Sequence, residues 1–307
     1  MLTCHATTDN ANDEMKCILF GAGGYIGRHL KAAMRTAGHV VMAHGATPQD
    51  RVDLSDAHAL AALDWDVDCV LLFAGVTGTL ASFARFGQFV TGNELALLNV
   101  LEAIRATPYR PRVIFPSSRL VYRGSDQALK ESDELDAKTV YAANKIACEF
   151  QLRAYANAFD VPHTIFRICV PFGNSLGGQY SYGTLGNFIQ QATQKRCITL
   201  YGDGSLRRTF THIDDVCDMV ILGASRQDVV NETFNLPGDD LSLLEAARCV
   251  AERLGANVQT CEWPVMDRRV ESGSTAFDGG KWIARTGLAP SRSLSLWAFS
   301  IVPHVGA

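Results

Sequence analysis

The sequence predicts an α/β protein with a doubly wound parallel sheet and a smaller α/β lobe in its C-terminal part. Short apolar runs alternate with helix-period segments through the first half of the chain, which is typical of a parallel sheet covered on both faces. A glycine triplet directly follows the first apolar run. The 307 residues exceed the usual size of one hydrophobic core, which favours a second lobe.

The expected elements follow this pattern in order. Strands are expected at 16–20, 39–43, 68–73, 112–116 and 162–168, and the clearest helices between them at 25–36, 93–106 and 140–158. After Pro171 the chain becomes rich in glycine and aromatic residues, so we expect a first domain over 15–170 and a lobe over 171–307. Within the lobe we expect a strand at 197–204 and helices at 214–225 and 241–254, with parts of 205–236 returning to the first domain.

Composition excludes several classes of protein. A net charge of −4 provides no basic field for nucleic acid, and no apolar stretch reaches the roughly 18 residues of a membrane helix. The nine cysteines are scattered without a CxxC, so we expect reduced core residues of a cytoplasmic protein and no metal site. The polar residues 1–14 are expected to form a disordered leader.

The stretch "CILFGAGGYIGRHL" places Gly21, Gly24 and Gly27 after the first strand and at the start of a helix. A dinucleotide site needs a tight turn, a backbone close to the pyrophosphate, and helix N-terminal amides directed at its charge. This context predicts a Rossmann-type cofactor site.

Tyr141 and Lys145 lie four residues apart in "TVYAANKIACE", so a helix presents both on one face. A nearby ammonium favours the phenolate and makes a tyrosine hydroxyl usable as an acid or base near neutral pH. The lysine can also hold a nicotinamide ribose. The pair follows Ser117 and Ser118, one of whose hydroxyls could bond the same substrate oxygen, while Arg167 is expected to be structural.

Five motifs, in family order, resemble those of the extended short-chain dehydrogenases/reductases, the NAD(P)-dependent epimerase/dehydratase family that acts on nucleotide sugars. They are "LLFAG", "NELALLNVLEA", "SSRLVYRG", "RICVPFG" and "LYGDGSLRRTFTHIDDV". The resemblance runs from Lys16 to about Leu294. It implies a nucleoside diphosphate sugar as substrate and a homodimer formed through a four-helix bundle, for which 93–106 and 140–158 are the candidate helices.

The resemblance also assigns roles to residues. Ser118, Tyr141 and Lys145 take the catalytic positions, with Tyr141 as acid/base. Cofactor-binding positions fall on Gly21, Gly24, Tyr25, Ile26, Gly27, Arg28, His44, Asp53, Leu54, Phe73, Ala74, Gly75, Asn93, Tyr141 and Lys145. Substrate-binding positions fall on Ser118, Arg119, Tyr141, Val170, Arg208 and Arg268. Arg208 matches the family's phosphate-binding arginine, Arg268 or Arg269 resembles a second one, and Val170 replaces the family's asparagine.

Three reactions are known on this scaffold: 4-epimerisation, 4,6-dehydration and reduction of a 4-keto sugar. Dehydratases place Asp-Glu directly after the catalytic threonine, because water must be eliminated across C5 and C6. Arg119 and Leu120 occupy those positions here and cannot serve as that acid or base. The sequence therefore argues against dehydration.

The use of the cofactor distinguishes 4-epimerisation from reduction of a 4-keto sugar. Epimerases retain NAD, and an acid at the end of the second strand usually binds its adenine ribose. His44 and Gly45 stand there instead, the run to Asp53 is short, and Arg28 or His44 could approach a 2'-phosphate. We therefore expect an NADP(H)-dependent 4-keto-6-deoxyhexose reductase, with NAD(H) possible as cofactor and an NAD-dependent 4-epimerase as the alternative. A non-catalytic NAD(P) sensor would predict a broken Ser-Tyr-Lys set, and all three are present. Arg123, where the family has glycine, has no assigned role.

Overall fold

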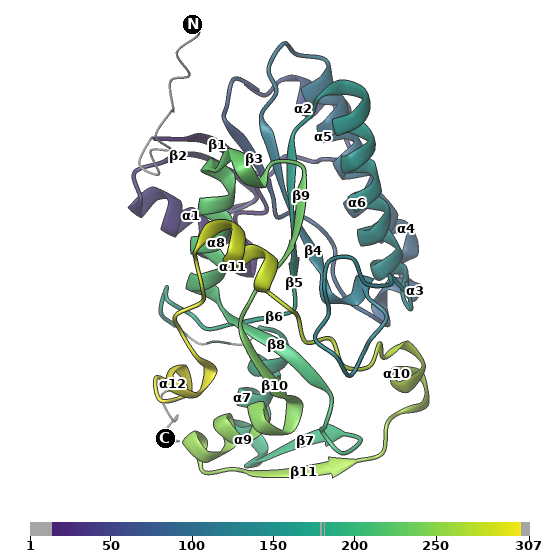
Figure 1. The fold of residues 1–307 in the computed structure, drawn as a ribbon, viewed down its shortest axis with the longest axis vertical. Coiled ribbons are helices and arrows are strands. Elements are labelled where there is room, and N and C mark those ends of the chain that lie inside the picture. The colour runs from purple at the N-terminus through teal and green to yellow at the C-terminus, as the bar shows by residue number, and fades with distance from the viewer. Residues whose placement is uncertain (1–13, 179, 181, 302–307) are drawn as a thin grey trace, which may run out of the picture.

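A six-stranded parallel sheet forms the centre of the larger part of the molecule (Figure 1). The computed structural model describes residues 14–178, 180 and 182–301, so the expected leader lies outside the described residues except for Glu14. The strand order is β2-β1-β3-β4-β5-β9, and every neighbouring pair is parallel. The strands are β1 (Lys16–Phe20), β2 (Val40–His44), β3 (Cys69–Leu72), β4 (Arg112–Ser118), β5 (His163–Ile168) and β9 (Glu232–Asn235). The predicted fold class is confirmed.

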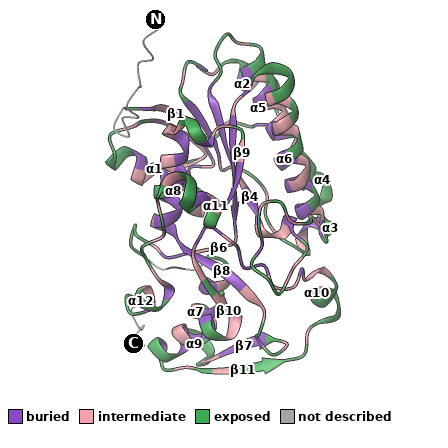
Figure 2. Ribbon diagram, viewed as in Figure 1, coloured by how far each residue is buried: buried purple, intermediate pink, exposed green. Residues whose placement is uncertain are grey.

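Helices cover both faces of this sheet. On one side lie α1 (Tyr25–Thr36), α8 (Ile213–Ser225) and α11 (Gly280–Thr286), and on the other α2 (Ala57–Ala61), α5 (Ala96–Arg105) and α6 (Val140–Phe159). Side chains alternate along a strand, so β1 contributes Cys17 and Leu19 to the first core and Ile18 and Phe20 to the second. Most residues of the central strands are therefore buried, as Figure 2 shows.

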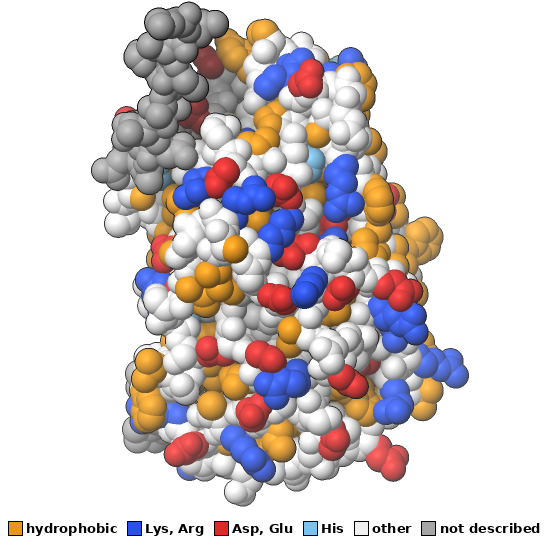
Figure 3. Space-filling model, in the orientation of Figure 1, with side chains coloured by type: hydrophobic (Ala, Val, Ile, Leu, Met, Phe, Trp, Pro, Cys, Tyr) orange, Lys and Arg blue, Asp and Glu red, His pale blue; other side chains and the backbone are white. Residues whose placement is uncertain are grey.

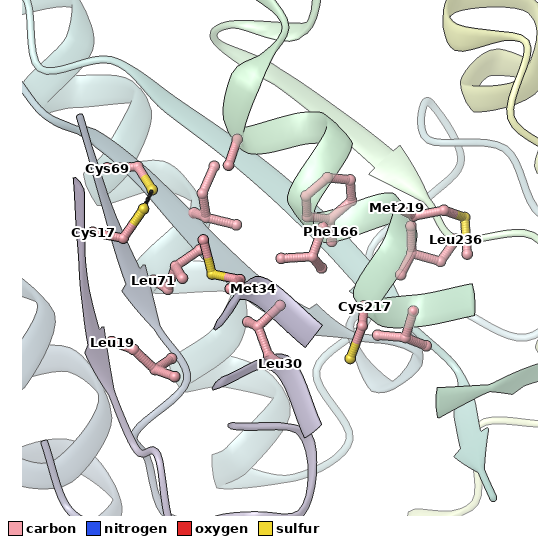
Figure 4. Close-up of a cluster of buried hydrophobic side chains, with 14 of the residues drawn as sticks. Cys17, Leu19, Leu30, Met34, Cys69, Leu71, Phe166, Cys217, Met219 and Leu236 are labelled. Carbon is pink, nitrogen blue, oxygen red and sulfur yellow. Dashed lines mark hydrogen bonds between the residues drawn. The ribbon is translucent and has the colours of Figure 1, made fainter. Parts of the chain in front are cut away.

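Cysteines contribute to the first core as thiols. Cys17 and Cys69 face each other across β1 and β3, with their sulfur atoms 3.0 Å apart (Figure 4). All eight cysteines in the described part of the chain are free, and four of them are buried. They pack as small apolar side chains.

The segment before α5 differs from the single helix predicted over 93–106. It is built from α3 (Ala81–Ala84), α4 (Phe86–Phe89) and a π-helical turn, η1 (Val90–Leu95), and α5 begins only at Ala96. π-helical turns often occur at functional sites, and this one carries Asn93.

The smaller lobe lies at the carboxyl ends of the central strands (Figure 1). It holds a three-stranded sheet, β6 (Val170–Phe172), β8 (Arg207–His212) and β10 (Asp239–Ser242), and a parallel pair, β7 (Cys197–Tyr201) and β11 (Asn257–Cys261). Its helices are α7 (Gly183–Lys195), α9 (Leu243–Leu254), α10 (Val265–Val270) and α12 (Leu294–Ala298). The short helices η2 (Arg119–Val121) and η3 (Gln227–Val229) follow β4 and α8.

Two predicted boundaries in this lobe shift for local reasons. The helix expected from 241 begins at Leu243, because Ser242 and Glu245 form a capping box. The strand expected to reach 204 ends at Tyr201, because Gly202 and Gly204 adopt φ values of 68° and 74°. The proposed division of the chain at residue 170 remains a prediction.

Charged side chains are mixed on the surface. Lysine and arginine alternate with aspartate and glutamate over the face shown in Figure 3. Among the described helices, none is both long and apolar enough to cross a membrane.

A buried ion pair joins α6 to the sheet. Both Glu149 oxygens accept hydrogen bonds from Arg167, at 2.6 and 3.0 Å, and both residues are almost fully buried. Ser117 Oγ donates to Glu149 Oε1 at 2.6 Å. Arg167 also donates to the Tyr122 hydroxyl at 2.6 Å, and that hydroxyl donates to Asn235 Oδ1 at 2.7 Å. The network thus links α6 to β4, β5 and β9, and Arg167 has the structural role predicted for it.

Replacing Glu149 with glutamine should destabilise the fold strongly, because the Arg167 guanidinium would stay buried without its counterion. We expect Glu149→Gln to lower the free energy of unfolding by about 3–5 kcal/mol, measured by denaturant unfolding. Glu134→Gln is the control, since Glu134 forms an exposed pair with Arg123 and should change stability by less than about 1 kcal/mol. Equal losses in the two variants would contradict this role of Glu149.

Candidate active site

The glycine loop joins β1 to α1 with no space for side chains at two positions. A Cβ on Gly21 would lie 2.5 Å from Ala74 N, and one on Gly27 would lie 2.1 Å from Gly21 O. Gly24 is the N-cap of the 12-residue helix α1, which has no side-chain cap and no acidic residue in its first turn. The first amides of α1 are therefore available to an anion such as a pyrophosphate. The loop fits the dinucleotide predicted from its sequence.

Two adjoining clefts run along the carboxyl ends of the central strands, where the strand order reverses between β1 and β3. The outer cleft has a volume of about 760 Å³ and the inner cleft about 300 Å³. Residues predicted for the cofactor line one or both of them: Gly21, Gly24, Tyr25, Ile26, Gly27, His44, Asp53, Leu54, Phe73, Ala74, Gly75, Asn93, Tyr141 and Lys145. The shared lining residues make the two clefts continuous.

The outer cleft ends at β2, where the sequence lacks the usual acid. His44 stacks on Phe20 with ring centroids 5.5 Å apart. The nearby Asp50 carboxylate is engaged within its own loop, where it accepts from the amides of Gly45 and Thr47 at 3.0 and 2.8 Å. Arg51, which lies in none of the sequence motifs, also lines this cleft.

Arg28 lies elsewhere. Its guanidinium carbon is 5.9 Å from the centre of the Tyr25 ring, and the described residues that line the outer cleft do not include it. The structure thus brings His44, but not Arg28, to the cleft wall where both were expected.

Asn93 fixes the loop that follows β3. Its Oδ1 accepts from Val76 N at 2.9 Å and its Nδ2 donates to Val76 O at 3.1 Å. Gly75 passes so close that a Cβ there would lie 2.8 Å from Asn93 Oδ1. Asn93 therefore shapes the wall of the inner cleft through the backbone.

Ser118, Tyr141 and Lys145 meet in the inner cleft. Ser118 is the last residue of β4, and Thr139 caps α6 by accepting from Ala142 N at 3.1 Å, which places Tyr141 in the first turn. Lys145, one turn later, donates from Nζ to Pro116 O at 2.7 Å. The three predicted catalytic residues are therefore neighbours.

Burial sets the charge of these groups. It raises the pKa of Tyr141 above its ordinary value, and the interaction with the Ser118 hydroxyl opposes that rise. Burial lowers the pKa of Lys145 from 10.5 to about 8. At neutral pH the site thus holds a protonated phenol beside an ammonium.

Several residues of the inner cleft were not predicted. Thr77, Ile168, Cys169, Pro171 and Tyr182 complete its lining. Tyr182 stacks on Tyr25 with ring centroids 4.0 Å apart, so α7 of the lobe contacts the glycine loop through this pair. Ile168, Cys169 and Pro171 belong to the "RICVPFG" motif, whereas Tyr182 lies in none of the motifs.

A third cleft of about 670 Å³, the lobe pocket, lies between β7, α7 and η2. Arg119 and Arg208 both line it. Arg208 is 2% exposed, donates to Glu271 at 2.8 Å, and has its pKa lowered to about 10 by burial and then by the charge of Arg119.

The other predicted substrate residues lie outside the lobe pocket. Arg268, on α10, lines a neighbouring cleft of about 630 Å³ whose described lining does not include Arg269. Val170 is buried in β6 and packs in the core of the lobe. Arg123 pairs with Glu134 at 3.0 Å on the surface, where both side chains are about two-thirds exposed.

No cluster of three or more His, Cys, Asp or Glu side chains in the described part of the chain could hold a metal ion. The inner cleft offers a bound substrate the Tyr141 phenol, the Lys145 ammonium and the hydroxyl of Ser118.

Comparison with known proteins agrees with this architecture. A dTDP-L-rhamnose 4-epimerase from Burkholderia thailandensis is 27% identical over 92% of this chain and 92% of that protein. A probable UDP-glucuronate 4-epimerase from Rhizobium meliloti is 26% identical over 67% of each. The solved structure of MoeE5 with UDP-glucuronic acid and NAD matches with a TM-score of 0.80 and 25% identity, covering 92% of this chain and 96% of that one.

The family model of the NAD dependent epimerase/dehydratase family matches residues 17–236, a range that holds the glycine loop, both clefts and the Ser-Tyr-Lys set. The chain therefore belongs to the NAD dependent epimerase/dehydratase family, as its motifs predicted.

Proposed function

We propose that this protein transfers a hydride at C4 of a nucleoside diphosphate sugar, and that it reduces the 4-keto group of an NDP-4-keto-6-deoxyhexose. The lining of the inner cleft carries this proposal. Beside Ser118 it holds the protonated Tyr141 and Lys145, and its described lining residues include no aspartate, glutamate or histidine. One phenol can protonate a ketone, whereas elimination of water needs a further acid and base.

Tyr141, Ser118 and Lys145 each have a separate role in the proposed reaction. The residues that line the two clefts would hold a nicotinamide cofactor, which would supply the hydride for the carbonyl carbon. The Tyr141 hydroxyl gives its proton to the carbonyl oxygen, while the Ser118 hydroxyl donates a hydrogen bond to the same oxygen. The Lys145 ammonium stabilises the phenolate left on Tyr141 and can donate to a ribose hydroxyl. A ketone, a hydride and a proton thus become a secondary alcohol.

We propose NADP(H) as the preferred cofactor, with NAD(H) as a second possibility. His44 and Gly45 at the end of β2 place no carboxylate where a 2'-phosphate would lie, and Arg51 adds a cation to the same cleft. The nearby Asp50 is already bound to two backbone amides. This environment favours a phosphate over a bare ribose diol.

A 4-epimerase is the second candidate, favoured by relatives named as 4-epimerases, one of which aligns with 92% of this chain. An epimerase needs the same three residues, but Tyr141 must first accept a proton from the C4 hydroxyl and then return one to the opposite face. It must also retain NAD between the two steps. The two reactions thus differ in what happens to the cofactor.

We also propose that the protein forms a homodimer through the outer surface of α6 and the neighbouring α4 and η1. Phe86, Val90 and Phe150 on these elements are 65%, 42% and 56% exposed. Burying such side chains between two copies would be favourable.

If the protein is a reductase, it should consume one reduced cofactor for each keto sugar that it reduces. With a dTDP- or CDP-4-keto-6-deoxyhexose, we expect absorbance at the nicotinamide band to fall, and faster with NADPH than with NADH. Retention of tightly bound NAD, with no oxidation of either cofactor by any of these keto sugars, would favour the epimerase instead.

Replacing Tyr141 by phenylalanine should lower turnover by about 10²- to 10⁴-fold, because the proton donor is lost. Cofactor affinity, measured by fluorescence titration, should stay the same. Tyr155→Phe is the matched control, since Tyr155 lies on the same helix and bonds to Glu102 on α5. Unchanged turnover in Tyr141→Phe would remove Tyr141 from the mechanism.

Lys145 should reduce the stability of the free protein. Its pKa is about 8 when folded against 10.5 ordinarily, so between these pH values the unfolded chain binds more protons and stability rises with pH. Below pH 8 the buried ammonium costs on the order of 3 kcal/mol. Lys145→Met should therefore be the more stable protein at pH 7, and denaturant unfolding should show this difference shrinking towards pH 10. A difference independent of pH would contradict the burial of a charged lysine.

A further inference from the structure

Tyr182 places a second phenol in the inner cleft, and the reaction proposed for this protein gives it no role. It is the N-cap residue of α7 and lines the cleft together with Ser118, Tyr141 and Lys145. Its hydroxyl forms no hydrogen bond with any residue that the structure describes. A phenol hydroxyl can donate and accept hydrogen bonds, so this one is available to a molecule bound in the cleft.

Stacking supports the Tyr182 ring. The ring lies on that of Tyr25, with centroids 4.0 Å apart and 14° between the ring planes. Tyr25 is itself held at the start of α1, because its hydroxyl donates to Gly173 O at 2.7 Å and its ring meets His29 edge-on, with centroids 5.3 Å apart. The stack therefore limits the rotation of Tyr182 and presents its hydroxyl from a supported ring.

The Tyr182 hydroxyl lies close enough to Tyr141 to affect its protonation. Burial is the main cause of the raised pKa of Tyr141, and the neighbouring Tyr182 raises it further. Burial also raises the pKa of Tyr182 above its ordinary value of 10.0. At neutral pH Tyr182 is therefore an uncharged phenol that can donate a hydrogen bond.

Tyr182 reaches this position from the smaller lobe. Earlier in the same connection, the Asn174 side chain bonds to α1, with its Oδ1 3.2 Å from His29 Nε2. Two residues after Tyr182, Thr184 lines the lobe pocket. The start of α7 thus borders both hollows, and a ligand that extends from Tyr141 towards the lobe pocket meets Tyr182.

The reacting molecules offer two kinds of acceptor to such a donor. A sugar has hydroxyl oxygens on the carbons beside its reacting carbonyl, and a nicotinamide ring has a carboxamide oxygen near the carbon that gives the hydride. Within the inner cleft, Tyr25 and Ser117 donate their hydroxyls to other residues of the protein. Apart from the two hydroxyls assigned to the reacting oxygen, the described lining then leaves only those of Thr77 and Tyr182. Of these two, Tyr182 has the supported ring beside the catalytic phenol.

We propose that the Tyr182 hydroxyl donates a hydrogen bond to an oxygen next to one of the two reacting carbons, and so helps to align the sugar with the cofactor. That oxygen is either a sugar hydroxyl beside the carbonyl or the carboxamide oxygen of the nicotinamide. The inference rests on the proposed function in taking the reactants to be a nucleotide sugar and a nicotinamide cofactor. It gives the start of α7 a direct part in binding, which none of the sequence motifs indicates.

Pairs of probes that differ by the group in question can identify the acceptor without turnover. NADPH is paired with 2'-phospho-ADP-ribose, and NADH with ADP-ribose, because the second member of each pair lacks the nicotinamide. The dTDP- and CDP-4-keto-6-deoxyglucoses are paired with dTDP and CDP, in the presence of oxidised cofactor so that no hydride is transferred.

Titration calorimetry of the nucleotide-free protein would compare wild type with Tyr182→Phe, which keeps the stacked ring and loses the hydroxyl. Tyr109→Phe is the matched control, because Tyr109 is 42% exposed against 39% for Tyr182 and is absent from the described lining of both cofactor clefts.

If the nicotinamide is the acceptor, Tyr182→Phe should raise the Kd of the preferred reduced cofactor by about 3- to 10-fold and leave that of its truncated partner unchanged. If a sugar hydroxyl is the acceptor, the Kd of the preferred keto sugar nucleotide should rise by about the same factor, and that of its nucleoside diphosphate should not change. Tyr109→Phe should bind every probe as wild type does. Either result supports the inference and identifies the acceptor.

Three results would overturn the inference. One is a Tyr182→Phe protein that folds as wild type, by circular dichroism, and binds every probe with unchanged Kd. Another is an equal rise in Kd for both members of a pair, which indicates a merely structural role. The third is wild type that binds none of the probes. Failure of the proposed reaction is a separate result: a protein with no turnover on keto sugars, but with Tyr182-dependent binding of only the longer probe of a pair, retains the inference and loses only the reductase assignment.

Discussion

The buried carboxylate of Glu149 is the constraint on which the geometry of the site depends. It lies on α6 two turns after Tyr141 and one after Lys145, and it binds Ser117, the neighbour of Ser118. The same carboxylate holds Arg167 on β5. Because one acid bonds both to the strand that ends in Ser118 and to the next strand, the helix cannot slide along the sheet without breaking a buried ion pair. The positions of the three predicted catalytic side chains follow from this attachment.

The candidate site contains positively charged side chains that are either buried or close to another positive charge. Lys145 is buried with a backbone carbonyl and an aromatic ring as its neighbours, and its pKa falls accordingly. Arg119 and Arg208 repel each other across the lobe pocket. Burial of the Lys145 charge and repulsion between the two arginines both reduce the stability of the folded protein.

Much of the fold could be predicted because its signals are local. Strands buried on both faces are rich in apolar residues, and the glycine loop and the Tyr141–Lys145 spacing are each contained in a short segment of the sequence. The remaining features arise from contacts between distant segments. Tyr182 reaches the inner cleft from α7, and Arg51 reaches the outer cleft from the loop after β2, but neither lies in a motif. Thr275 contacts both Arg119 and Arg208, although these three residues lie far apart in the sequence.

Arg119, the residue directly after Ser118, bears on both the reaction and the substrate that we propose. An acid there could assist elimination near the reacting carbon, whereas an arginine cannot accept a proton at any ordinary pH. The same guanidinium places a full positive charge between Tyr141 and the lobe pocket, where it lowers the pKa of Tyr141 against the larger effect of burial. A cation at this point favours the phenolate that remains after Tyr141 has protonated a ketone. An arginine at this position thus provides no acid or base for an elimination and places a positive charge beside Tyr141.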